Sequence, residues 1–106
     1  MAPRRAGLAD LTALKARDEI ARGALKAVAL AEACIERIAA REPEVQAFVH
    51  FDPDYVMRQA EAADRYRGTG RPIGPLHGVP VAVKDIVDTR DFPTENGTPL
   101  DSGRRR

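Results

Sequence analysis

A long apolar stripe at helical spacing in the first half of the chain most constrains the fold. Six residues recur at intervals of three and four, which places them on one face of a helix: Ala27, Leu30, Ala31, Cys34, Ile35 and Ile38. Pro43 follows them and cannot donate the backbone hydrogen bond that a continuing helix needs. We therefore expect an amphipathic helix that stops at Pro43 and needs a partner for its apolar face.

The flanking segments predict two more helices. Residues 11–22 are helical in pattern, with Asp10 placed as an N-cap acceptor and Gly23 where a left-handed residue ends a helix. Asp52 and Pro53 supply a capping carboxylate and a preset φ that begin a third helix. That helix carries an apolar stripe as far as a loop rich in glycine and proline.

Two short apolar segments predict β-strands. Residues 45–51 place Ala47, Val49 and Phe51 at a period of two, with Phe48 also apolar. The apolar run 79–83 has Pro80 at its start, where a missing donor is tolerated. Both strands are expected to be largely buried. Residues 88–106 show neither a period of two nor one of 3.6, so we expect a loop there. The pattern is that of an α/β fold with about three helices and two strands.

Composition limits both the core and the partners. The chain has 106 residues, so it forms one domain at most. It is rich in alanine, which adds little buried area, so we expect a thin core. The net charge of +1 provides no overall field toward nucleic acid or an anionic membrane. Cys34 is the single cysteine, and residues 1–8 are basic without an apolar stretch behind them, so we expect a flexible terminus and a cytoplasmic protein.

Lys84 is the first residue that could carry chemistry. It directly follows the apolar run 79–83, where desolvation lowers the pKa of an amine and lets it act as a general base. Alternatively, it marks the end of a strand and reaches into water. Asp85 could orient Lys84 or bond to the backbone of a nearby turn. His50 and His77 lack further ligands at metal-binding spacing, so no metal site is expected.

The surroundings of Lys84 resemble a known family. The stretch from Gly74 to Thr89, followed by Pro93 to Pro99, closely resembles the amidase signature family. Upstream segments resemble the N-terminal helices of that family, so the resemblance spans nearly the whole chain after residue 8. It covers roughly the first quarter of a full-length member. We therefore expect residues 1–106 to be the N-terminal portion of an amidase domain, part of an α/β/α sandwich with a mixed central sheet.

The resemblance implies a catalytic role for one residue. Catalysis in this family uses a nucleophilic serine, a second serine and a lysine that serves as base through the second serine, and Lys84 matches that lysine. Asp85 would then orient Lys84 without contacting the substrate itself. In full-length members of the family, both serines lie downstream of the segment that this sequence resembles. Ser102 is the only serine here, so we expect the chain to be inactive alone.

The resemblance also implies the reaction. A full-length member would hydrolyse the C–N bond of a small-molecule amide to acid and amine, without cofactor or metal and without direct contact to nucleic acid or membrane, and a homodimer is compatible with it. Two alternatives stay open. The chain could be part of an A subunit of a tRNA-dependent amidotransferase, or a non-catalytic helical interaction module or gene remnant. Arg106 stands where the family usually has proline, so we expect an interrupted end.

Overall fold

The computed structural model describes residues 5–105, which divide into two compact units. The elements are α1 (Arg5–Leu8), α2 (Ala13–Ala21), α3 (Ala27–Val45), α4 (Pro53–Gly68) and the 3₁₀-helix η1 (Pro99–Asp101). The first unit comprises Met1–Ala47 and Asp52–Pro80, and the second comprises Phe48–Phe51 and Val81–Arg106. All four α-helices therefore belong to the first unit.

Helix α2 begins later than expected. Its N-cap is Thr12, whose Oγ1 accepts a hydrogen bond from the backbone N–H of Lys15 at 3.1 Å. The expected cap at Asp10 is wrong, because Asp10 and Leu11 form the turn that closes α1. The Asp10 carboxylate instead accepts a hydrogen bond from Arg37 at 2.9 Å. That contact ties the start of the chain to α3.

Helix α3 runs past the proline that was expected to stop it. Pro43 lies inside the helix, which ends at Val45 and is followed by Gln46 in the left-handed region with a φ of 53°. A proline removes one intrahelical bond, here the one to the carbonyl of Ala39. Ala39 is exposed, so water can satisfy that carbonyl and the last turn survives.

The predicted start of α4 is confirmed. Asp52 is its N-cap, and its Oδ1 accepts a hydrogen bond from the backbone N–H of Tyr55 at 3.1 Å. Pro53 occupies the first helical position, where its missing N–H has no consequence. Gly23, expected to be left-handed at the end of the preceding helix, has a φ of 81°.

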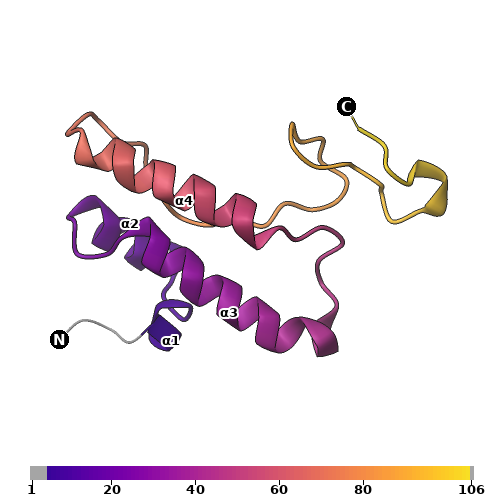
Figure 1. Ribbon diagram of the computed structural model, residues 1–106, viewed down its shortest axis with the longest axis horizontal. Coiled ribbons are helices and arrows are strands. Elements are labelled where there is room, and N and C mark those ends of the chain that lie inside the picture. The colour runs from indigo at the N-terminus through magenta and orange to yellow at the C-terminus, as the bar shows by residue number, and fades with distance from the viewer. Residues whose placement is uncertain (1–4, 106) are drawn as a thin grey trace. The chain divides into compact units, whose positions relative to one another are not determined.

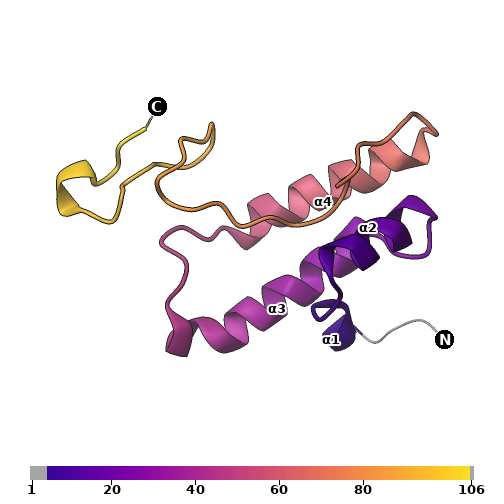
Figure 2. The same ribbon diagram turned by 180° about the vertical axis from the view of Figure 1, so that it is seen from behind.

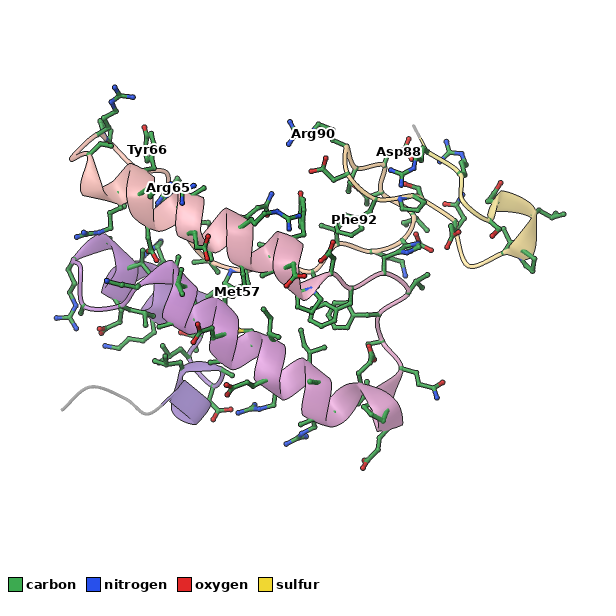
Figure 3. The ribbon with its side chains drawn as sticks, in the orientation of Figure 1. Met57, Arg65, Tyr66, Asp88, Arg90 and Phe92 are labelled. Atoms are coloured by element: carbon green, nitrogen blue, oxygen red, sulfur yellow. The ribbon has the colours of Figure 1, made fainter. Side chains whose placement is uncertain are left out.

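Helix α3 is the centre of the first unit. It packs against α1 on one side and runs antiparallel to α4 on another (Figure 1). One cluster of buried residues contains Leu8, Ala16, Ile20, Leu30 and Ala33, and a second contains Ala27, Ala31 and Ala60. Met57 of α4 lies on the side that faces α3 and packs against the second cluster (Figure 3). Five of these eight residues are alanines, so the core is as thin as composition predicted.

Two long-range polar contacts join the helix ends. The carboxylate of Asp64 in α4 accepts hydrogen bonds from the first backbone amides of α3, at 2.8 Å from Ala27 and 3.1 Å from Val28. Arg67, one turn further along α4, donates from Nε to the carbonyl oxygen of Ile20 at the end of α2, at 2.8 Å. One turn of α4 therefore caps an N-terminus and a C-terminus of its neighbours.

The segment after α4 turns back along the helices (Figure 2). The ring nitrogen Nε2 of His77 lies 2.8 Å from the carbonyl oxygen of Ala63. Gly78 has a φ of 80°, and a Cβ built on it would lie 3.1 Å from the Cβ of Ala27. Glycine is therefore required at this position both by its backbone conformation and by its close approach to α3.

The two expected strands are absent. Residues 45–51 and 79–83 form no strand, nor does any other segment within the range 5–105. A strand needs a neighbour that satisfies its backbone donors and acceptors. Val81 and Val83, expected to be buried, are 72% and 55% exposed. The apolar pattern is real, but no neighbouring strand among the described residues covers it.

The two ends of the chain differ from their expected form in part. Of residues 1–8, expected to be flexible, 5–8 form α1 with Leu8 buried, and 1–4 lie outside the described residues. Of residues 88–106, expected to form a loop, 88–105 contain the turn of η1 and otherwise irregular backbone, and Arg106 is not described. No helix within residues 5–105 is long and apolar enough to cross a bilayer.

Candidate functional site

Lys84 lies at the start of a turn in the second unit. Its carbonyl oxygen accepts a hydrogen bond from the backbone N–H of Val87 at 3.1 Å, and its side chain is exposed. Its ammonium group makes neither a hydrogen bond nor an ion pair within residues 5–105. The amine is thus available to a partner that the second unit does not itself supply.

Asp85 joins the Lys84 turn to a segment ten residues further along. Its Oδ1 accepts a hydrogen bond from the backbone N–H of Glu95 at 3.0 Å, and its carbonyl oxygen accepts one from Asn96 at 3.0 Å. The carboxylate therefore bonds to the backbone of a later turn, one of the two roles considered for it. Its other oxygen, Oδ2, is buried and has no hydrogen-bond partner in the described part of the chain.

Thr94 completes the connection and was missed by sequence reasoning. It is 1% exposed, its backbone N–H donates to the carbonyl oxygen of Arg104 at 2.6 Å, and its hydroxyl donates to that of Val87 at 3.3 Å. Arg104 in turn pairs with Asp88 at 2.8 Å, which raises the pKa of the arginine. A lone threonine in an irregular segment has no periodic pattern to mark it as buried.

The two histidines have separate structural partners. His50 Nε2 lies 3.0 Å from Oε1 of Glu95, whose Oε2 accepts a hydrogen bond from the backbone of Gly103 at 2.5 Å. The imidazole ring also packs at 6.5 Å from the ring of Phe92. His77 belongs to the first unit, where its ring contacts α4. No group of three or more His, Cys, Asp or Glu residues that could hold a metal ion occurs between residues 5 and 105.

The site brings together an amine and a carboxylate on one anchored turn. Lys84 provides an amine, and Asp85 provides a carboxylate with one oxygen that is unpaired within residues 5–105, on a turn that Thr94 and Glu95 hold in place. Ser102 is exposed, and its backbone N–H donates to the carbonyl oxygen at position 99 over 3.3 Å. A hydroxyl, an amine and a carboxylate are present, but no second serine is available for a relay.

Comparison with known proteins identifies relatives of much greater length. The A subunit of the glutamyl-tRNA(Gln) amidotransferase from Chloroflexus aurantiacus is 44% identical over 98 residues, which are 92% of this chain and 20% of that protein. The corresponding A subunit from Salinispora arenicola is 41% identical over 101 residues, covering 92% of this chain and 21% of its own length. The chain therefore spans about one fifth of the length of the curated relatives it matches.

No solved structure matches the chain. The model of the amidase family matches residues 29–106, a range that includes most of α3, all of α4 and the whole turn around Lys84. The chain belongs to the amidase family.

Proposed function

We propose that Lys84 is the catalytic base of an amidase that hydrolyses a carboxylic amide, working within a longer amidase domain. The observation that carries this proposal is the position of Lys84 inside the segment matched by the family model, with an exposed ammonium group on an anchored turn. The family resemblance supplies the roles. The described geometry supports them because the amine is not committed to any structural contact among residues 5–105.

The reaction has a defined proton path. A nucleophilic serine attacks the amide carbonyl carbon, and its proton passes through a second serine to the Lys84 amine. The C–N bond breaks as the amine leaves with that proton, and water then hydrolyses the acyl ester. Asp85 holds the Lys84 turn through its bonds to residues 95 and 96, which fixes the origin of the lysine side chain. The chain by itself lacks the two serines and is therefore inactive.

A chimera tests this function. The chain would replace the matched fifth of the Chloroflexus aurantiacus protein, and amide hydrolysis would be compared with that of the isolated chain. We expect activity in the chimera and none in the chain alone. Lys84→Ala should lower kcat by at least about a hundredfold, the usual contribution of a general base.

Two further variants separate proton transfer from charge. Lys84→Arg keeps the positive charge but cannot release its proton, so it should be as inactive as Lys84→Ala. Lys26→Ala, at another exposed lysine, should leave kcat unchanged. Full activity of the chimera with arginine at position 84, or lysine-dependent hydrolysis by the isolated chain, would refute the assignment.

The names of the relatives favour a second candidate function. Both are A subunits of a glutamyl-tRNA(Gln) amidotransferase, which makes membership of such a complex the specific alternative to a free-standing amidase. That role requires partner subunits and a tRNA-bound substrate. The discriminating experiment inserts the chain, in place of the matched segment, into an amidotransferase A subunit and separately into a free-standing amidase. Restored amidation of glutamyl-tRNA(Gln) in the first host without amide hydrolysis in the second favours the amidotransferase, and the reverse result favours the amidase.

A further inference from the structure

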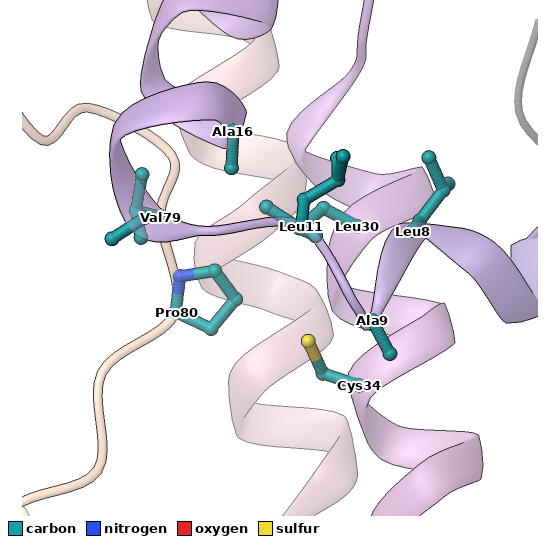
Figure 4. A pocket seen from close by; sticks show the side chains of 9 residues that line it. Leu8, Ala9, Leu11, Ala16, Leu30, Cys34, Val79 and Pro80 are labelled. Atoms are coloured by element: carbon teal, nitrogen blue, oxygen red, sulfur yellow. The ribbon is translucent and has the colours of Figure 1, made fainter.

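A pocket opens in the first unit, which does not contain Lys84. Its volume is about 150 Å³, and it is partly open to solvent. It lies where the turn after α1, helices α2 and α3 and the returning loop meet (Figure 4). The side chains that matter for its chemistry are Leu8, Leu11, Ala16, Leu30, Cys34 and Pro80.

The lining is aliphatic except for one thiol. The sulfur of Cys34 points into the space that Leu11 and Pro80 border (Figure 4). Burial raises the pKa of the Cys34 thiol, so the group is neutral at pH 7 and presents a soft, weakly polar surface. Among the described residues no charged side chain lines the pocket, although the Arg37 guanidinium is close enough to act on the Cys34 thiol. Such a lining disfavours strongly polar ligands.

Three of the nine lining residues are held in place by the packing of the unit. Leu8, Ala16 and Leu30 are between 3% and 5% exposed and belong to one buried cluster. The returning loop contributes Val79 and Pro80 to the wall. The two residues before them fix the loop, because Gly78 lies against α3 and His77 bonds to α4. The buried part of the wall does not need to be reorganised when a ligand enters, whereas Ala13 and Pro80 at its edge are exposed.

Size and lining together define the class of ligand. An apolar site of about 150 Å³ has room for a molecule of the size of benzene. Contacts between sulfur and an aromatic ring are favourable, which selects an aromatic ligand over an alkane of equal size. We propose that this pocket binds a small uncharged aromatic molecule, with its ring against the Cys34 sulfur.

The proposal can be tested on the chain as it exists. Benzene is titrated while the methyl signals of Ala16 and Leu30 are followed by NMR, and saturable shifts with a dissociation constant on the order of 1 mM are expected for so small a ligand. Alkylation of Cys34 provides a second readout. With benzene at about ten times the dissociation constant, the rate should fall about tenfold, because only the free pocket reacts.

A matched pair of variants locates the binding. Ala13 is an exposed residue at the rim of the pocket, and Ala13→Leu should fill the opening and abolish the shifts. Ala39→Leu adds the same side chain to an exposed position of α3 that does not line the pocket, and binding should persist. Circular dichroism shows whether each variant keeps its helices.

Three results would overturn the proposal. They are the lack of saturation with benzene, equal shifts in the Ala13→Leu variant with its helices intact, and Cys34 alkylation that benzene does not slow. Should Ala13→Leu lose its helices, the alkylation of the unmodified chain decides alone. Cyclohexane that binds more tightly than benzene would also refute the aromatic selectivity.

Discussion

Removing the Asp64 carboxylate should destabilise α3, although Asp64 belongs to α4. The residue at the N-cap position, Lys26, provides no side-chain hydrogen bond, and the cap comes instead from Asp64, 37 residues beyond Ala27. Both carboxylate oxygens are used, at 2.8 Å from the amide of Ala27 and 3.1 Å from that of Val28. Asp64→Ala removes both acceptors and the negative charge at the positive end of the helix.

The magnitude follows from these contacts. Loss of a capping side chain costs about 1 kcal/mol. Ala27 is 1% exposed, so water does not readily reach its freed amide, and an unsatisfied buried donor adds about 1 kcal/mol or more. The free energy of unfolding should therefore fall by about 2 kcal/mol, which lowers Tm by about 10 °C for a chain of this length. Asp64→Asn keeps one acceptor and should lose about half as much.

Chemical and thermal unfolding monitored by helical circular dichroism measure the effect. Glu61→Ala is the control, because Glu61 is an exposed acidic residue one turn earlier on α4. Its effect should stay within about 0.5 kcal/mol, as is usual for surface positions. The reasoning fails if Asp64→Ala and Glu61→Ala destabilise the chain equally, or if hydrogen exchange of the first α3 amides does not accelerate in Asp64→Ala.

Three further changes test other parts of the first unit. Gly78→Ala should destabilise by about 1 to 3 kcal/mol more than Gly70→Ala in urea unfolding, because both have a positive φ but only Gly78 has side-chain atoms within 4 Å of the added Cβ. Cys34, whose pKa is raised by burial, should be alkylated more slowly in the folded chain than in urea at pH 8; equal rates would contradict its burial. Arg37 lowers the pKa of Asp10 below its ordinary 3.8, so their contribution to stability is present above that pH and is lost as pH falls through the lower folded value. Asp10→Asn should flatten that part of an acid unfolding series, and an unchanged series would show that the pair is not maintained in solution.

The helices could be predicted because their signals are local. The helix α3 and the Asp52–Pro53 start of α4 depend on residues within a few turns of each other, and both are confirmed. Of the predicted apolar stripe, Ala27, Leu30 and Ala31 are buried, and the other three members are partly buried. Apart from the helix end expected at Pro43, the errors in the helical part lie where tertiary contacts decide. Asp10 caps nothing because it pairs with Arg37, and the cap of α3 comes from Asp64, which no local pattern connects to it.

The residues of the candidate site could be predicted from the sequence, but the hydrogen bonds that hold them could not. Lys84 and Asp85 stand out through family resemblance, and their roles remain predictions. The burial of Thr94 and the bond between Asp85 and Glu95 join segments without periodicity, so their geometry could not be anticipated. Irregular backbone satisfies its hydrogen bonds with whichever groups the fold brings near, and sequence spacing carries little information about that choice.

The missing strands follow from the same principle. A helix satisfies its own backbone, whereas a strand depends on a neighbour, so a β-branched sequence specifies a strand only when that neighbour is present. Val81, Val83 and Ile86 are all more than half exposed, and the adjacent Oδ2 of Asp85 is buried without a partner among the described residues. An exposed apolar run beside an unsatisfied carboxylate oxygen is what an interior strand would look like without its neighbours. Since the chain spans one fifth of its relatives, we expect the remaining part of an amidase domain to cover this run and to donate to Asp85.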